Sequence, residues 1–316
     1  MSADDTVRIA TRRSPLAMAQ ASQVAARLSE LCGRSVVLSP VVTTGDVSTE
    51  ALSTIGGTGV FVGAVRDAVL AGDAEIAVHS LKDLPTAEHR GLAIAAIPVR
   101  EDPRDALCAD DGQTLAELGP GARVGTGSPR RAAQLRALRP DLEIVDIRGN
   151  VDTRLAKVTD GELDAVVLAV AGLTRLGRDA AITEAIDPEH ILPAPGQGAL
   201  AVESRADLAN RDPELARALA ELNDPQTHVA VTAERALLNR LEAGCSAPVG
   251  ALATITSSSA PDNHVHLEAL TAGADGTRVI RMSATGPASD AGELGRQLAV
   301  AMLAAGAAHL LGEPSL

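Results

Sequence analysis

Arginine side chains stand near the predicted starts of helices in two similar segments of the chain. Each segment reads as a strand, a polar turn and then Ser-Pro opening a helix, at residues 7–15 and again at 124–131. Serine is a good helix N-cap, and proline suits the first helical position. The exposed amides and the dipole of a helix start attract anions, so guanidinium groups beside them would strengthen an anion site. The arginines at these turns, or following the next strand, are Arg12, Arg13, Arg130, Arg131, Arg148 and Arg154.

The chemistry that arginine favours is the binding of carboxylate or phosphate groups. Its planar fork of donors binds them bidentately, and each charge-assisted hydrogen bond contributes roughly 1.5–3 kcal/mol. The chain has a formal net charge of −13, and only two of its 28 basic residues are lysines. The arginines could therefore be solvated side chains that balance a surplus of acid. Their recurrence at corresponding turns instead favours a polyanionic ligand.

A second candidate site follows the predicted strand 75–79, in the segment His79-Ser80-Leu81-Lys82-Asp83-Leu84-Pro85. Polar residues at the carboxyl end of a strand in an α/β domain face the ligand crevice. Asp83 could act there as a general acid or base, or stabilise a developing cation. The alternative is an ordinary turn in which Lys82 and Asp83 form an exposed ion pair that contributes little.

Cys245 is the cysteine best placed for reactivity, because it follows a predicted helix in the turn Gly244-Cys245-Ser246-Ala247-Pro248. A turn of this kind can present a side chain outward, although a lone turn cysteine is more often structural. No His and Asp partners are recognisable near it, so a protease-like nucleophile is not indicated. Cys32 and Cys108 have the contexts of small apolar fillers.

Two further patterns carry weaker signals. The glycine-rich loop 56–61 is neither a Walker motif nor a convincing dinucleotide fingerprint, so nucleotide binding is not favoured. His264 and His266 share one face of a predicted strand and could hold a metal ion, but an exposed strand is the more ordinary interpretation.

Short β-rich runs alternate with helical patterns up to about Val202, which is typical of an α/β fold with mostly parallel strands. The run Gly72–Val78 has a similar pattern to the run Gly161–Val167. The repeat predicts two similar α/β domains with a ligand cleft between them. The charged turn 100–105 is a candidate hinge. The strands expected in this region are 7–10, 35–42, 75–79, 91–98 and 143–147, and the helices are 15–31 and 61–71.

Beyond about Leu219 the pattern changes to that of a third, α+β domain. A helix is expected over 226–243, strands over 264–270 and 278–284, and a closing helix over 291–311. The chain has one Phe and neither Tyr nor Trp, which excludes aromatic cages and base-stacking platforms as its main means of recognition. Its acidity argues against nucleic acid or an anionic membrane as partner. Without a secretory signal or a long apolar run, the chain is expected to be cytoplasmic.

Taken in order, eight segments of this sequence resemble the porphobilinogen deaminase (hydroxymethylbilane synthase) family over essentially the whole chain. They are ATRRSPLAMAQ (10–20), GTGVFV (57–62), HSLKDLPT (79–86), REDPRDAL (100–107), VGTGSPRRAAQL (124–135), IRGNVDTRL (147–155), PAPGQGAL (193–200) and GCSAPVG (244–250).

The resemblance implies an α/β fold of two periplasmic-binding-protein-like domains with a central cleft, and a smaller α+β C-terminal domain. The expected division is 1–99 with 199–217 for the first domain, 100–198 for the second and 218–316 for the third. The first would carry the catalytic aspartate, the second the carboxylate-binding arginines, and the third a covalently bound dipyrromethane cofactor.

The resemblance also implies the roles of individual residues. Asp83 matches the catalytic aspartate, and Cys245 would hold the dipyrromethane through a thioether. The positions that match contacts to the cofactor are Lys82, Arg130, Arg131, Arg148, Arg154, Ser80, Ser128 and Gln197. The positions that match contacts to the substrate are Arg12, Ser14, Phe61, Arg148 and Arg154. Phe61 could equally be a core residue of its helix.

The activity implied is head-to-tail condensation of four porphobilinogen molecules onto the dipyrromethane primer, with loss of ammonia, followed by hydrolytic release of hydroxymethylbilane. Each pyrrole ring bears an acetate and a propionate, which would explain a cationic site in an acidic protein. The family implies a monomer that needs neither metal nor nucleotide. Many members carry lysines where this chain has Thr54 and Thr58, so the role of that loop in holding carboxylates is open here.

Two other functions share parts of this pattern. A non-catalytic solute-binding protein for a carboxylated ligand would have the same two-domain architecture, but it gives no reason for the third domain or the Cys245 turn. A regulatory ligand-sensing module would be expected to have a DNA-binding helical segment before the first strand, and the sequence has none.

Overall fold

The computed structural model describes residues 6–42, 62–244, 247–256 and 263–311, and the chain forms two compact units. Unit 1 comprises Met1–Glu101 and Ala199–His228, and unit 2 comprises Asp102–Gly198 and Val229–Leu316. The first boundary falls within the charged turn 100–105, where the sequence predicts a hinge. Residues 218–228, which the sequence analysis assigned to a third domain, pack with unit 1.

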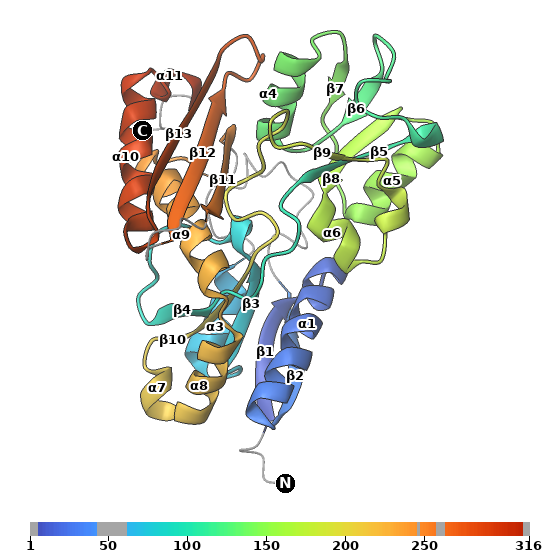
Figure 1. Cartoon of the computed structure of the whole chain (residues 1–316). Coiled ribbons are helices and arrows are strands. Elements are labelled where there is room, and N and C mark those ends of the chain that lie inside the picture. The colour runs from blue at the N-terminus through green and yellow to red at the C-terminus, as the bar shows by residue number, and fades with distance from the viewer. Residues whose placement is uncertain (1–5, 43–61, 245–246, 257–262, 312–316) are drawn as a thin grey trace. The chain divides into compact units, whose positions relative to one another are not determined.

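Unit 1 is built on a five-stranded sheet in the order β2-β1-β3-β10-β4 (Figure 1). Strand β10 is antiparallel to both of its neighbours, and the other four strands run in one direction. The expected mostly parallel sheet is therefore confirmed. Its strands are β1 (Thr6–Arg12), β2 (Ser35–Val41), β3 (Ile76–Ser80), β4 (Leu92–Ala96) and β10 (Leu200–Arg205).

Helices cover both faces of this sheet. Helices α1 (Pro15–Cys32) and α8 (Pro213–Leu222) pack on one face, and α3 (Gly63–Ala71) packs on the other. A short helix, α7 (Leu208–Arg211), precedes α8. Helix α1 forms as the sequence predicts: the Ser14 side chain accepts a hydrogen bond from the Ala17 amide, and Gly33 ends the helix at φ 67°.

Unit 2 contains a second five-stranded sheet, in the order β7-β6-β8-β5-β9, in which only β5 runs antiparallel to its neighbours. The predicted internal repeat is therefore confirmed in topology, because both sheets have the antiparallel strand in the same place. The strands are β5 (Asp105–Ala109), β6 (Arg123–Gly125), β7 (Glu143–Val145), β8 (Ala165–Ala169) and β9 (Glu184–Ile186). The helices are α4 (Pro129–Leu138), α5 (Val151–Thr159) and α6 (Val170–Arg175).

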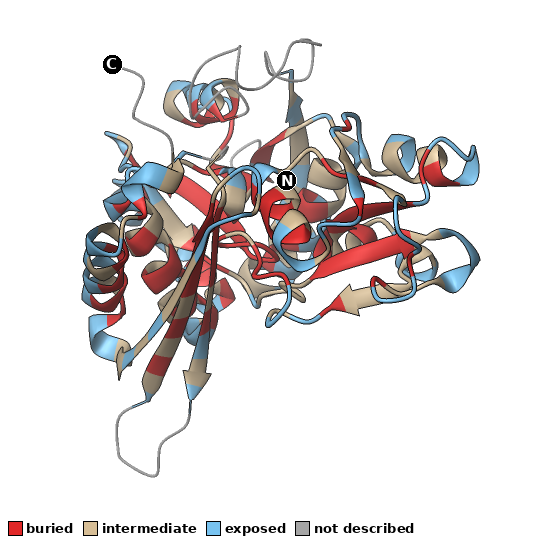
Figure 2. Cartoon of the chain, turned by 90° about the horizontal axis from the view of Figure 1, so that it is seen from above, coloured by how far each residue is buried: buried red, intermediate tan, exposed pale blue. Residues whose placement is uncertain are grey.

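The rest of unit 2 is an antiparallel sheet, β11-β12-β13, with helices packed on one face, as expected for an α+β domain. Figure 2 shows buried residues along β11 and β12 and on the helix sides, whereas β13 has only intermediate and exposed residues. The elements are α9 (Pro225–Arg240), whose first residues belong to unit 1, β11 (Val249–Thr256), β12 (His264–Ala272), β13 (Val279–Pro287), α10 (Ala291–Ala304) and α11 (Ala308–Leu311).

Several expected elements differ in extent, for example the helix expected over 226–243, which ends at Arg240. The closing helix 291–311 is wrong as one element: it is divided into α10 and α11 because Gly306 adopts φ 96°, which breaks the helical backbone. The strand expected over 143–147 ends at Val145, and Ile147 keeps only a long contact of 3.4 Å to the Thr126 carbonyl. None of the described helices meets the length and apolarity needed to cross a membrane.

Candidate functional site

A pocket in unit 1 gathers four of the predicted site residues. Strands β1 and β3 are parallel neighbours, so their carboxyl ends meet at one edge of the sheet. Arg12 ends β1, Ser14 caps the helix that follows, and Ser80 ends β3. The pocket has a volume of about 70 Å³ and is lined by Arg12, Ser14, Leu16, Ala17, Gln20, Val62, Val78, His79, Ser80 and Asp83.

Asp83 is held in this pocket by the turn that carries it. Leu81 and Leu84, on either side, are 1% and 3% exposed and anchor the 3-10 turn Leu81–Asp83 in the core. The Leu81 amide donates to the Ala199 carbonyl, and the Leu84 amide closes the turn onto the Leu81 carbonyl. Asp83 itself is exposed, so its carboxylate is accessible to a ligand bound in the pocket.

A buried ion-pair network lies behind the pocket. Glu203 accepts two hydrogen bonds from Arg66, at 2.9 and 2.8 Å, and its Oε2 lies 3.1 Å from Nε2 of His79. Burial alone would raise the pKa of Glu203, but the hydrogen bonds and charges of His79 and Arg66 outweigh it and lower the pKa to about 2. Glu203 is therefore a carboxylate at any physiological pH.

Glu203 should make the stability of the protein depend on pH in the acid range. Because its folded pKa is depressed from 4.5 to about 2, its contribution of about 3 kcal/mol is complete above pH 4.5 and lost as the pH falls toward 2. Urea denaturation between pH 2 and 6 should show a smaller loss in Glu203→Gln than in the natural protein. Glu30→Gln, at an exposed ion pair, is the control and should behave as the natural protein does. Equal pH dependence in Glu203→Gln and the natural protein would contradict the assignment.

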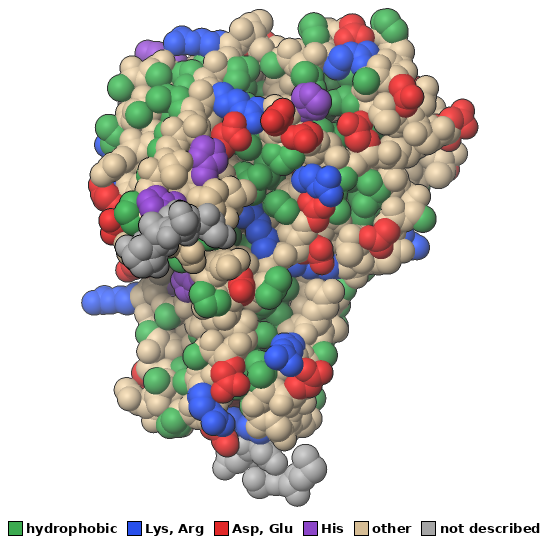
Figure 3. All heavy atoms as spheres, viewed as in Figure 1, with side chains coloured by type: hydrophobic (Ala, Val, Ile, Leu, Met, Phe, Trp, Pro, Cys, Tyr) green, Lys and Arg blue, Asp and Glu red, His purple; other side chains and the backbone are tan. Residues whose placement is uncertain are grey.

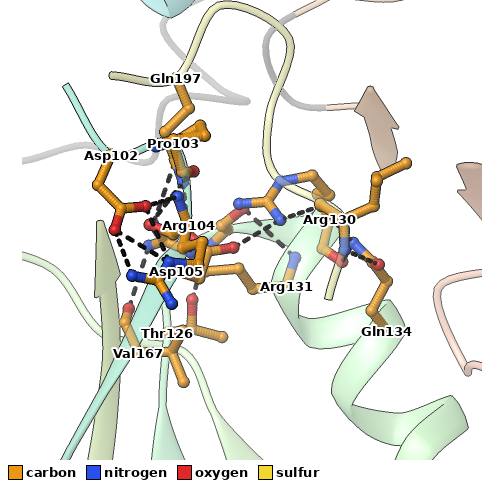
Figure 4. Close-up of polar contacts among 12 residues, drawn as sticks. Asp102, Pro103, Arg104, Asp105, Thr126, Arg130, Arg131, Gln134, Val167 and Gln197 are labelled. Atoms are coloured by element: carbon orange, nitrogen blue, oxygen red, sulfur yellow. Dashed lines mark hydrogen bonds and ion pairs between the residues drawn. The ribbon is translucent and has the colours of Figure 1, made fainter. Parts of the chain in front are cut away.

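In unit 2 the arginine pair of α4 surrounds a buried aspartate, as Figure 4 shows. Asp105 is 0% exposed, and Arg130 and Arg131 are 3% and 6% exposed. Arg131 donates to Asp105 Oδ1 at 2.9 and 2.7 Å, and Arg130 lies 2.7 Å from Oδ2. Burial would raise the pKa of Asp105, but the two guanidinium groups hold it well below its usual range. Two cations against one anion leave this cluster with a net positive charge.

The same cluster ties together distant parts of unit 2. Gln197 donates to Asp105 Oδ1 at 2.8 Å and to the Pro103 carbonyl at 2.8 Å. Arg130 donates to the Leu192 carbonyl at 2.6 Å, and Ser128 caps α4 by accepting from the Arg131 amide. The segment 192–197 is therefore fixed to the start of α4.

Arg148 and Arg154 lie at the start of α5, beside the cluster. Gly149 adopts φ 110°, and Asn150 caps the helix by accepting from the Thr153 amide. Burial lowers the pKa of Arg154, and the charges of Arg131 and Arg148 lower it further. The guanidinium groups of Arg131 and Arg148 thus repel that of Arg154, opposed by Asp146, and an anionic ligand would relieve that repulsion.

The structure describes most, but not all, of the predicted site. Cys245 and Phe61 lie outside the described residues, as do Thr54 and Thr58. Lys82 is half-buried beside Asp83 and is not among the residues that line the pocket. On the face shown in Figure 3, basic side chains are interspersed with acidic ones. The described part of the chain holds no group of three or more His, Cys, Asp or Glu that could bind a metal ion.

Three residues of these networks were not singled out from the sequence: Asp105, Glu203 and Arg66. Glu203 carried a usable signal, because a glutamate inside the apolar strand Leu200–Arg205 must be paired when buried. Asp105 is the last residue of a charged turn and the first residue of the buried strand β5. Because the neighbouring turn residues are charged, its burial could not be predicted from the sequence. Of the two cysteines expected to be fillers, Cys108 is buried, and burial raises its pKa to about 12, while Cys32 is partly buried against the core of unit 1.

Comparison with known proteins decides the family. Residues 7–212 match the family described as "Porphobilinogen deaminase, dipyromethane cofactor binding domain", and residues 228–304 match "Porphobilinogen deaminase, C-terminal domain". This chain belongs to the porphobilinogen deaminase family. Similar relatives include porphobilinogen deaminase 1 of Streptomyces coelicolor, 54% identical over 98% of both chains. The porphobilinogen deaminase of Nocardia farcinica is 55% identical over 97% of this chain and 88% of its own length.

Solved structures show more distant likenesses. The VFT2 domain of Bordetella pertussis BvgS is 17% identical, with a TM-score of 0.42 over 70% of this chain and 89% of that one. A periplasmic substrate-binding protein of an ABC transporter from Coxiella burnetii is 16% identical, with a TM-score of 0.42 over 70% of this chain and 94% of that one. The fold described above does not rest on them.

The porphobilinogen deaminase family has dipyrromethane as its cofactor, and the residues of unit 2 fit such a group. Each of its two pyrrole rings bears two carboxylates, so it is a polyanion. Burial and then the charges of Arg131 and Arg148 lower the pKa of Arg154, and bound carboxylates would stabilise its charged form.

Proposed function

We propose that this chain is a hydroxymethylbilane synthase, a transferase that condenses four porphobilinogen molecules head to tail and releases the linear tetrapyrrole by hydrolysis. The observation that carries the proposal is the unit 1 pocket, in which an exposed carboxylate, Asp83, lies with a cation, Arg12, at one sheet edge. A solute-binding protein of this fold would use the cation to hold a carboxylate but would not need Asp83 exposed there.

Asp83 is proposed as the catalytic residue. Loss of ammonia from porphobilinogen leaves a cation delocalised over the pyrrole ring, and coupling then requires removal of a proton from carbon. A carboxylate beside the ring can accept a hydrogen bond from the pyrrole N–H, offset the transient charge and move the proton. The anchoring of its turn by Leu81 and Leu84 supports this role, because a fixed group needs little reorganisation during the reaction.

The arginines are proposed to bind the acetate and propionate groups. Arg12, with Ser14, suits a substrate carboxylate at the start of α1. Arg148 and Arg154 suit carboxylates of both substrate and cofactor, and Arg131 and Arg130 add the net positive charge of their buried cluster. Ser80, Ser128, Gln197 and Lys82 complete the proposed set.

Cys245 is proposed as the attachment point of dipyrromethane, through a thioether. The cofactor, when bound, supplies the pyrrole position to which substrate units are added. The residues flanking the turn are anchored: Leu241 and Val249 are 5% and 3% exposed. We further propose that the protein is a cytoplasmic monomer with three domains, residues 218–228 belonging with the first, and that neither nucleic acid nor membrane is a partner.

Arg148→Ala is expected to raise the KM for porphobilinogen or stall elongation, with product formation lowered about 10- to 100-fold, because each charge-assisted bond contributes roughly 1.5–3 kcal/mol. Steady-state kinetics, with mass spectrometry of enzyme-bound chains, measures both effects. Arg123→Ala is the matched control, since Arg123 is a partly exposed arginine of the same unit paired with Asp164. Unaltered product formation in Arg148→Ala would count against the carboxylate role.

The proposed function itself is tested by incubating the protein with porphobilinogen. The expected result is release of one ammonia per porphobilinogen consumed and formation of hydroxymethylbilane. A solute-binding protein would bind porphobilinogen and leave it unchanged, and that outcome would refute the proposal.

A further inference from the structure

His79 lies between the pocket that holds Asp83 and the buried pair of Arg66 and Glu203, which the roles proposed above do not use. His79 is among the residues that line the pocket, and its Nε2 is fully buried and lies 3.1 Å from Oε2 of Glu203. The three side chains are 7%, 8% and 3% exposed for His79, Arg66 and Glu203. A buried charged network beside a pocket suggests a role beyond stability, because well-packed apolar residues of similar volume are often equally stabilising.

The position of this histidine is fixed by the sheet. His79 is on β3 opposite Ala201 of the antiparallel strand β10, so Glu203, two residues further along, projects on the same face. Helix α3 brings Arg66 onto that face, where its two hydrogen bonds orient the carboxylate. The ring therefore has a rigid support on the side away from the pocket.

The support also determines which nitrogen carries the proton. With its pKa lowered to about 2, Glu203 only accepts hydrogen bonds, so the nitrogen that faces it must be the N–H. The contact is less linear than an ideal hydrogen bond, but among the described residues Glu203 supplies the acceptor nearest to Nε2. In a neutral ring with the proton on Nε2, Nδ1 is left as an acceptor.

The other polar groups of the pocket define what this acceptor can bind. Gln20 and Ser80 hydrogen-bond each other, at 2.9 and 3.0 Å, and Arg12 is suited to a carboxylate. Asp83 and Nδ1 of His79 are two acceptors among these groups. We infer that Nδ1 of His79 accepts a hydrogen bond from an N–H group of bound porphobilinogen, the pyrrole N–H or the aminomethyl group, and that Glu203 and Arg66 position it. This inference rests on the proposed function.

Two substitutions separate the nitrogens of the ring. The side-chain amide of His79→Gln reaches the position of Nε2 and can still donate a hydrogen bond to Glu203, but it places no acceptor at the position of Nδ1. The amide of His79→Asn reaches the place of Nδ1 and leaves Glu203 to Arg66. We expect kcat/KM for porphobilinogen to fall about 10- to 100-fold in His79→Gln and to stay within about threefold in His79→Asn. Thermal melting checks that both variants fold. Equal kcat/KM in His79→Gln and the natural protein, or equal losses in the two variants, would overturn the inference.

Binding of an analogue with methyl in place of aminomethyl identifies the donor. If His79→Gln weakens the binding of both compounds, the pyrrole N–H is the donor. If it weakens the binding of porphobilinogen alone, the aminomethyl group is the donor. Weakening of neither overturns the inference. Nitrogen-15 NMR of the natural protein without substrate should show His79 protonated at Nε2 and not at Nδ1, and the reverse would also overturn it. A natural protein that leaves porphobilinogen unchanged would refute the proposed function, whereas the NMR result would still stand.

Discussion

Replacing Asp83 with alanine is expected to slow product formation at least ~100-fold, because a positioned acid or base contributes about 10²–10⁴ to the rate. The turn should keep its shape, since Leu81 and Leu84 anchor it and the Asp83 side chain is exposed. The loss should therefore appear in kcat, while thermal stability and any cofactor already on the protein are retained. Steady-state assays with porphobilinogen, together with a melting curve, measure both.

Two further variants sharpen this test. Asp83→Asn keeps the size of the side chain and its ability to accept a hydrogen bond, but it removes the charge and the ability to hold a proton. It should lose nearly as much activity as Asp83→Ala. Asp73→Ala removes an exposed aspartate of the same unit and should leave the rate unchanged. Near-normal turnover in Asp83→Ala would refute the catalytic role.

Asp105→Ala is expected to destabilise the protein by about 3–5 kcal/mol, which is the usual cost of removing one partner from a buried ion pair. The loss has a direct cause: Arg130 and Arg131, both less than a tenth exposed, would be left as buried cations without their carboxylate. Gln197 would lose one of its acceptors as well. Urea denaturation of the purified variant measures the free energy of unfolding.

The control for Asp105 is Glu162→Ala, which removes a carboxylate from the exposed pair with Lys157 in the same unit and should cost less than about 1 kcal/mol. Asp105→Asn, which keeps an acceptor but not the charge, should lie between the two, and it serves if Asp105→Ala fails to fold. Stability of Asp105→Asn equal to that of the natural protein would contradict the view that this charge neutralises the arginine pair.

The elements that the sequence predicted well are those with strong local signals. Helix α1 has a serine cap, a proline at its first position and a glycine at its end, and all three act as the sequence indicates. The repeat between the two five-stranded sheets was visible because a strand, a polar turn and Ser-Pro recur in order. The closing helix was predicted too long, since Gly306 is a weak sign within an alanine-rich run until its φ of 96° is known.

The candidate site divides in the same way. The pocket residues Arg12, Ser14, Ser80 and Asp83 could be predicted because each stands at the end of a strand or the start of a helix. The burial of Arg130 and Arg131 could not be predicted, because it depends on Asp105 and Gln197, which are 25 or more residues away in the chain. The support of His79 likewise depends on Glu203, which lies on the neighbouring strand β10 and is separated from His79 in the chain by residues 102–198 of unit 2. The local sequence pattern predicts that a side chain lies at the end of a strand or helix, but it does not predict the residue with which that side chain forms a hydrogen bond or an ion pair.

The central claim is that a dipyrromethane group is permanently attached to Cys245, and intact-mass measurement of the purified protein tests it most directly. The predicted result is a mass above that of the polypeptide by two deaminated porphobilinogen units, absent in Cys245→Ala and retained in the control Cys32→Ala. Active protein that carries no such adduct, or an adduct that persists in Cys245→Ala, would contradict the account.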